Sequence, residues 1–246
     1  MRTLLACLLV LIAFPVVGAD APADGKAVLD QAIEAAKAVE NVHFKVKIQP
    51  EGVIANFIGA AEAEGVLAGW DPEINLPAKF WTRLTTTLPR TTDPVTYTGG
   101  SNGEMFYLVD HTNKKGYEDI DPGVFGSAGQ VLNSAVPISL VNDSPYSQDA
   151  AGESFELLEN ATVGGVECYT VKVVFGEANF EKEAILHFGT EDLLPRRMVR
   201  HYDVSGQGTG KLILDFDALD PNPTLDAKRF SMTLPEGFEQ IDDFAP

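Results

Sequence analysis

The chain has 246 residues, 45% of them hydrophobic, and carries a formal net charge of −18 at pH 7. Such an acidic balance disfavours nucleic acid and anionic membrane surfaces as partners, because both attract lysine and arginine. Of the two cysteines, Cys7 lies in the N-terminal apolar segment, so Cys168 has no intramolecular partner once that segment is removed. We expect Cys168 to be buried as a small apolar side chain.

The N-terminal segment has the pattern of a secretory signal peptide. A positive charge at Arg2 precedes an apolar run from Leu4 to Val17, and small residues end the run at Gly18 and Ala19. The run is shorter than the ~20 residues that a helix needs to span a bilayer. We therefore predict cleavage after Ala19 and a periplasmic or secreted mature chain without a membrane-spanning segment.

Two other interpretations of this segment fit less well. Cleavage after Ala21 would place Pro22 directly behind the cut. Lipidation of Cys7 would require the apolar run to end there, whereas the run continues well past that residue. We therefore expect residues 1–19 to be the removed signal and residues 20–246 to form a single domain.

An amphipathic helix is expected at the start of the mature chain. Asp24 is a suitable N-cap and Asn41 a suitable stop. Glu34 and Lys37 fall on the polar side, as expected for a helix that packs one face against a core. The apolar residues recur at three- and four-residue spacing and are Val28, Leu29, Ala32, Ala36 and Val39.

After this helix the apolar period changes to two. In residues 42–49, four apolar residues alternate with polar ones, which predicts a half-buried antiparallel strand. Gly99-Gly100-Ser101-Asn102-Gly103 predicts a hairpin turn further along. The other predicted strands are residues 62–70, 78–88, 105–110, 155–159, 167–175, 184–188, 197–203 and 211–216, with a short last strand over 230–234.

The middle of the chain departs from this strand pattern. Residues 124–136 carry apolar side chains at helical spacing, and Pro137 ends the predicted helix. Residues 139–152 are polar and contain small residues, which predicts a loop. Many consecutive strands with few helices indicate one large, curved antiparallel sheet, and the two apolar helices are expected to fill its hollow face. The predicted fold class is mainly β with helices (α+β).

No catalytic or metal-binding motif stands out in the sequence. His43, His111, His187 and His201 are scattered and lack the spacing of a metal site. A nucleophile elbow is absent, and the glycine-rich segment 206–210 leads into a strand, whereas a phosphate site needs a helix N-terminus. We therefore predict no metal, no cofactor and no enzymatic activity.

Two charged groupings allow more than one interpretation. Asp215 and Asp217 share one face of a predicted strand, where they form either a solvated face or, in an unrecognised hydrolase, an acid/base pair. Arg196 and Arg197, with Arg200 nearby, either contact an anionic group or pair with neighbouring carboxylates. In a chain this acidic, we expect pairing with carboxylates, and we expect the two aspartates to be solvated.

Several short sequence segments, in the same order along the chain, resemble the LolA-like family of exported lipoprotein carriers. They include residues 29–46, Gly65-Val66-Leu67 through Phe80-Trp81-Thr82-Arg83, and Asn102-Gly103-Glu104-Met105-Phe106-Tyr107. The others are residues 135–140, 186–198 and 230–238. The resemblance implies an unclosed antiparallel β half-barrel, covered by the N-terminal helix and by the mid-chain helix as a lid.

The resemblance also implies a hydrophobic cavity that holds an acyl chain of a lipid-modified protein or another hydrophobic ligand. An arginine that holds the lid in the family falls near Arg83, which makes Arg83 the expected polar contact. The sequence departs from the family pattern at Asn102, where an aspartate is usual. The expected lining residues come from the strands and the lid helix: Phe44, Val46, Phe80, Leu84, Met105, Tyr107, Val131 and Leu132.

The expected function is therefore the binding or transport of a hydrophobic ligand by a monomeric exported protein. Burying each CH₂ group is worth about 0.8 kcal/mol, so a single acyl chain suffices for reversible capture. The alternative is an envelope sensor or protein-docking module that uses the same fold without cargo. Envelope proteins are the expected partners in that case, and nucleic acid is not an expected partner in either.

Overall fold

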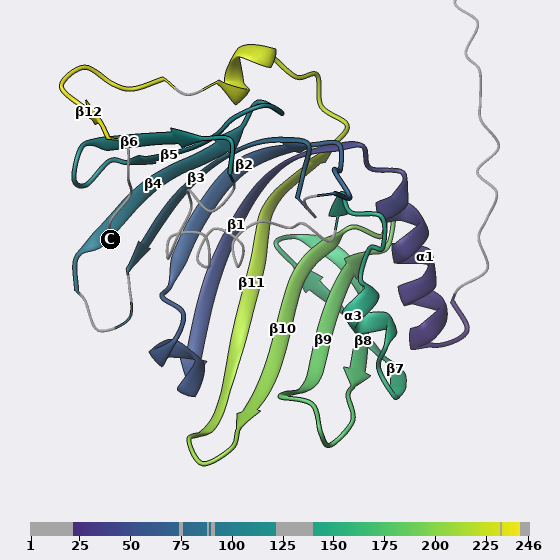
Figure 1. Ribbon diagram of the computed structural model, residues 1–246. Helices are drawn as coiled ribbons and strands as arrows, with labels where there is room; N and C mark the ends of the chain where they lie inside the picture. The colour runs from purple at the N-terminus through teal and green to yellow at the C-terminus, as the bar shows by residue number, and fades with distance from the viewer. Residues whose placement is uncertain are drawn as a thin grey trace, which may run out of the picture.

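The structure, a computed structural model, describes residues 22–73, 76–87, 89, 92–121, 140–231 and 233–241. Figure 1 shows a long, curved sheet whose two edges do not meet, with α1 (Gly25–Lys37) and α3 (Ser147–Ala150) beside the strands at one end. The 12 strands lie in the order β12-β6-β5-β4-β3-β2-β1-β11-β10-β9-β8-β7. This open sheet with few helices confirms the predicted α+β half-barrel.

The strand order follows directly from the chain, because most neighbours are consecutive hairpins. One half of the sheet contains β1 (Asn41–Gly52), β2 (Ala61–Ala68), β3 (Lys79–Thr87), β4 (Pro94–Ser101), β5 (Phe106–Asp110), β6 (Lys115–Asp119) and β12 (Glu239–Gln240). The other contains β7 (Ser154–Val163), β8 (Val166–Val174), β9 (Glu181–Gly189), β10 (Pro195–Val204) and β11 (Gly208–Pro221). Paired strands are antiparallel, except that β12 runs parallel to β6.

The pairing of β1 with β11 joins the two halves at the centre of the sheet. Along β1 the apolar residues are buried, and His43, Lys45 and Lys47 alternate with them, as the period of two predicted. A β-bulge in β11 interrupts the register between Lys45 and Val46, which places Asp217 in the bulge. The central pair thus buries one face continuously while the other carries charge.

Helix α1 forms where its spacing predicted. The Asp24 side chain accepts a hydrogen bond from the backbone N–H of Ala27 (2.9 Å) and caps the N-terminus. The helix ends at Lys37, earlier than the expected stop at Asn41, which instead begins β1. Its predicted apolar face is buried and packs on β7 and β8. The helix therefore covers one end of the sheet.

Three other expectations were wrong in detail. Gly99 and Gly100 lie inside β4, so the turn begins only after Ser101. The described residues of the expected strand over 230–234, which are 230, 231, 233 and 234, are not in a strand: Phe230 ends a short helix, η4 (Ala227–Phe230), which the Asp226 side chain caps by accepting from the Lys228 N–H. The expected loop at 139–152 contains α3 and buried side chains. At β4 and α3, contacts with distant strands outweigh the local turn signal, whereas at η4 a local side-chain cap decides the structure.

Two sequence expectations fall outside the described residues. The N-terminal signal segment is one, and the mid-chain helix with Val131 and Leu132 is the other. Among the helices in the described part of the chain, none is both long and apolar enough to cross a membrane. Cys168 is buried, as expected.

Candidate functional site

The sheet has an inner face, on which α1 and α3 pack, and an outer face. Directly opposed residues of an antiparallel pair share a face, so the register identifies every residue on the same side as Phe44. Toward the strand ends this face of β1–β5 includes one charged residue, Asp110 opposite Tyr97, together with Val42, Ile48, Thr86, Val95 and Ser101. The residues between them form a continuous surface without charge, which we call the inner wall. Its members are Phe44, Val46, Ala61, Ala63, Gly65, Leu67, Phe80, Thr82, Leu84, Tyr97, Gly99, Phe106 and Leu108.

The structure brings together half of the predicted lining residues. Phe44, Val46, Phe80 and Leu84 all lie in the inner wall, where each is at least 94% buried. Val46 is opposite Ala63, which in turn is opposite Leu84, so small side chains on β2 separate the large ones on β1 and β3. The wall is therefore apolar, and large and small side chains alternate from strand to strand across it.

Among the other predicted residues that the structure describes, Tyr107, Met105 and Arg83 do not join this surface. Tyr107 lies opposite Gly100 and belongs to the outer face, where it is buried. Arg83 also lies on the outer face, exposed, between Glu64 and Thr98 in register. Met105 is in the turn before β5. Phe106 and Leu108, one residue away from Tyr107 on either side, occupy the inner wall in its place.

The prediction for β5 was wrong by one residue, since Tyr107 was expected on the wall and its neighbours occupy it, and this error has a physical cause. All five residues of this strand are buried, so the apolar–polar alternation that identifies a face is lost. The signal that identifies the outer side is Gly100, because a Cβ added there would lie 2.3 Å from Tyr107 Oη. A glycine in a strand commonly marks such a close approach.

The outer face of β3–β6 is covered by the C-terminal segment, residues 222–241 (Figure 1). The guanidinium of Arg229 lies 4.8 Å from the ring centre of Trp81 on β3. The Phe238 ring packs edge-on against His111, with 5.7 Å between centres, and Leu234 fills the space over Gly116. This cover explains why β5 is buried on both sides.

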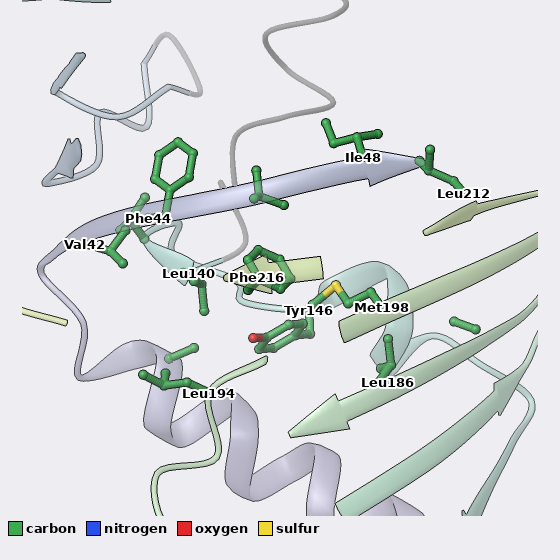
Figure 2. Packing of buried hydrophobic residues seen from close by; sticks show 14 of the residues in the cluster. Val42, Phe44, Ile48, Leu140, Tyr146, Leu186, Leu194, Met198, Leu212 and Phe216 are labelled. Atoms are coloured by element: carbon green, nitrogen blue, oxygen red, sulfur yellow. The ribbon is translucent and has the colours of Figure 1, made fainter. Parts of the chain in front are cut away.

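The inner face of the other half is filled by helices and a connecting segment. We call β7–β11, with α1, α3 and residues 140–150, the helix-covered half. Figure 2 shows Leu140 and Tyr146 among Phe216, Met198 and Leu186 from the strands. The Tyr146 ring meets Phe188 edge-on, with 5.4 Å between centres. Side chains of this segment therefore occupy the hollow at this end.

A buried ionic group fixes α3 to β10. Arg200 donates hydrogen bonds to Asp149 of α3 (3.0 Å) and to Glu181 of β9 (2.7 Å). Burial opposes the charge of Arg200, but the two carboxylates outweigh it and raise its pKa. Burial raises the pKa of Glu181, against the influence of Arg200. The sequence predicted carboxylate pairing for this arginine, but not that the partners would be buried.

The remaining charged groupings are paired on the outer face. Arg197 pairs with Asp215 (2.5 Å) and Lys47 with Asp217 (2.8 Å), beside a groove of about 860 Å³. Arg196 pairs with Asp192, so the expected pairing of these arginines is confirmed. Basic partners neutralise Asp215 and Asp217, which fits a solvated face better than an acid/base pair. Within the described ranges, no group of histidine, cysteine and carboxylate side chains could hold a metal ion.

One polar atom of the inner wall is exceptional. The Thr82 side chain is fully buried, and among the described residues its hydroxyl has no hydrogen-bond partner. An unsatisfied buried hydroxyl costs about 1–3 kcal/mol, so each such group in a folded protein calls for an explanation. The wall can therefore bury an apolar ligand, and the Thr82 hydroxyl can offer that ligand one polar contact.

No known protein-family model matches the chain, and no curated protein matches it. Among solved structures, it resembles Mycobacterium tuberculosis lipoprotein LppX, with 14% identity and a TM-score of 0.48 over 81% of this chain and 96% of LppX. LprF from Mycobacterium bovis has 11% identity and a TM-score of 0.48, covering 87% of this chain and 97% of LprF. MucB has 11% identity and a TM-score of 0.49, covering 85% of this chain.

This chain spans 62% of the MucB structure, which is less than two thirds of its length. Identities of 11–14% with TM-scores below 0.5 give no basis for transferring a ligand or an activity to this chain.

Proposed function

We propose that this protein is an exported carrier or binding protein for a hydrophobic ligand, such as the acyl chain of a lipid or lipid-modified protein. The observation that supports it is the inner wall of β1–β5, a continuous uncharged surface that includes Phe44, Phe80 and Leu84. In the other half of the sheet, the hollow is occupied by the segment that contains Tyr146. The ligand is therefore assigned to the wall and not to the helix-covered half.

The energetics suit reversible binding. Each CH₂ group of a ligand gains about 0.8 kcal/mol when it leaves water. The wall is itself buried, with Leu84 and Leu108 fully so, and a ligand has to exchange places with the contacts that bury it. The net affinity is the difference between two apolar contacts of similar strength, and release needs only a modest competitor. No charge chemistry and no cofactor enter this function.

The cellular setting of this proposal comes from the sequence. A signal peptide cleaved after Ala19 would deliver residues 20–246, as one monomeric domain, to the periplasm or the exterior. Lipids, lipid-modified proteins and envelope proteins are the partners found there. The strongly acidic charge keeps the carrier away from anionic membrane surfaces, so it encounters cargo as a dispersed protein.

A pair of neighbouring residues on β2 offers a direct test. Ala63 faces the inner wall, whereas Glu62 is exposed on the outer face. In Ala63→Trp the indole occupies the space between Val46 and Leu84, and the affinity for a fluorescent fatty-acid probe should fall about tenfold or more. Glu62→Trp adds the same side chain to the other face and should leave the affinity unchanged.

Thermal unfolding of both variants shows that each is folded at the assay temperature, and the smaller Ala63→Val serves if the tryptophan unfolds the protein. Equal affinities in Ala63→Trp and wild type would exclude the inner wall as the site. Probe binding no better than to an unrelated protein, together with a stable envelope-protein partner and no co-purifying lipid, would favour the docking function instead.

A further inference from the structure

Thr82 stands in a gap in the inner wall. Its register partners are Gly65 on β2 and Gly99 on β4, so neither neighbouring strand places a side chain beside it. Along β3, Phe80 and Leu84 follow at two residues to either side on the same face. We call this position the niche: a hydroxyl flanked by two glycines across the strands and by two large apolar side chains along β3.

The two sides of the niche differ. On the β2 side the Phe44 ring lies over Gly65, because a Cβ added there would be 2.6 Å from Phe44 Cζ. On the β4 side the register partner is Gly99, so β4 contributes no side chain beside Thr82. Leu108 on β5 is the next wall residue in that direction.

The hydroxyl of Thr82 differs from that of a second threonine on the same face. Thr86, four residues further along β3, is also buried, and its Oγ1 donates a hydrogen bond to the Ala60 carbonyl (3.1 Å). Thr82 Oγ1 has no such partner among the residues that the structure describes. A buried donor without a partner gains the full strength of a hydrogen bond when a ligand supplies the acceptor.

The character of the acceptor follows from the absence of charge in the wall. A carboxylate placed beside Thr82 would lose its hydration without meeting a cation, since the inner-wall residues are neutral and the charged residue on the same face of β1–β5, Asp110, is itself an anion. A carbonyl oxygen is uncharged, and a single hydroxyl donor satisfies it. The niche therefore suits a carbonyl that is directly attached to an apolar chain.

We infer that Thr82 is a specificity-determining residue whose hydroxyl donates to the carbonyl oxygen of an ester- or amide-linked acyl chain. This inference rests on the proposed function, because it assumes that acyl chains bind at the inner wall. The apolar chain lies against Phe80 and Leu84, and the linkage carbonyl lies over Gly99 within reach of Oγ1. The protein then distinguishes acylated molecules from free fatty acids and from plain hydrocarbon.

The test compares methyl palmitate, palmitate and hexadecane as competitors of a fluorescent probe, in wild type, Thr82→Val and Thr86→Val. Thr82→Val should bind methyl palmitate about tenfold more weakly than wild type, with hexadecane affinity unchanged. Thr86→Val should bind methyl palmitate as wild type does, because its hydroxyl is already satisfied. A long-chain N-methyl amide in place of the ester shows whether both linkages are recognised.

The outcomes separate two failures. If wild type binds none of the three ligands, the proposed function is overturned. If wild type binds them but Thr82→Val lowers the affinity for the ester and the hydrocarbon equally, or for neither, only the role of Thr82 is overturned. Tighter binding of palmitate than of its methyl ester by wild type would also contradict it, since the wall would then be recognising a carboxylate. Thermal unfolding confirms that the valine variants are folded.

Discussion

The helix-covered half and the inner wall differ in how their buried polar groups are held. In the helix-covered half, Arg200 meets two carboxylates in a buried group that fixes α3 to the sheet. The Tyr146 hydroxyl of that half is unpaired among the described residues, but its ring packs on Phe188 inside the filled hollow. In the inner wall, the buried Thr82 hydroxyl is likewise unpaired among the described residues, and its register partners on both sides are glycines. The ion pairs of Arg200 hold α3 in one position on the sheet, whereas the Thr82 hydroxyl remains a hydrogen-bond donor with which a bound ligand can pair. We call the helix-covered half the fixed half for this reason, and we expect the ligand in the other.

The largest effect is expected when the fixed half loses its central cation. Arg200→Met leaves Asp149 and Glu181 buried without a counter-charge, which should lower the free energy of unfolding by about 3–5 kcal/mol. Arg197→Met removes an arginine from a more exposed pair with Asp215 and should cost less than about 1 kcal/mol. Urea unfolding of both variants at neutral pH measures the difference. Equal losses of unfolding free energy in the two variants would show that the buried ion pairs of Arg200 stabilise the protein no more than the exposed pair of Arg197 does.

Leucine truncations on the two sides should separate stability from binding. Leu186→Ala, on β9, should lower the free energy of unfolding by about 3 kcal/mol through the cavity that it leaves. The folded fraction of that variant should bind the fatty-acid probe with unchanged affinity. Leu84→Ala, on β3, should reduce probe affinity about tenfold, because it removes apolar surface from the wall. An affinity loss in Leu186→Ala as large as in Leu84→Ala would place the ligand across both halves.

The smallest effect concerns pH. Burial raises the pKa of Glu181 above its ordinary value of 4.5, so the folded protein holds this proton more tightly than the unfolded chain does. The contribution of Glu181 to stability is therefore fully present below the ordinary pKa and is lost as the pH rises through the raised one. Glu181→Gln lacks this titration, and urea unfolding over a pH series should show the stability of wild type relative to this variant falling across that window. A relative stability that rises with pH would contradict the assigned direction.

Elements with one buried face could be predicted from the sequence. Strand β1 and helix α1 each place apolar residues on a single side, so their periods of two and 3.6 identified both the element and its buried residues. The lining residues on β1 and β3, such as Phe44 and Leu84, followed from the same alternation. The four predicted lining residues that lie in the inner wall all come from these two strands.

The remaining positions depend on contacts between distant segments. Tyr107 was assigned to the cavity because nothing in β5 shows that residues 222–241 cover its other face. Gly99 and Gly100 resemble turn residues in sequence, and only the pairing with β3 and β5 shows that they lie beside Thr82 and Tyr107. The burial of Asp149 likewise results from a partner, Arg200, that is 51 positions away.

The central pairing of β1 with β11 also governs the order in which the chain can fold. The backbone N–H of Glu40 donates to the Asn222 side chain, a partner 182 positions away, at the end of this pair. The hairpins on either side can form locally, but the seam between them can close only when β11 has been synthesised. Until then, the edge of β1 that faces β11 is unpaired. A chain with this connectivity stays incompletely folded through most of its synthesis, which would suit the export that the N-terminal segment predicts.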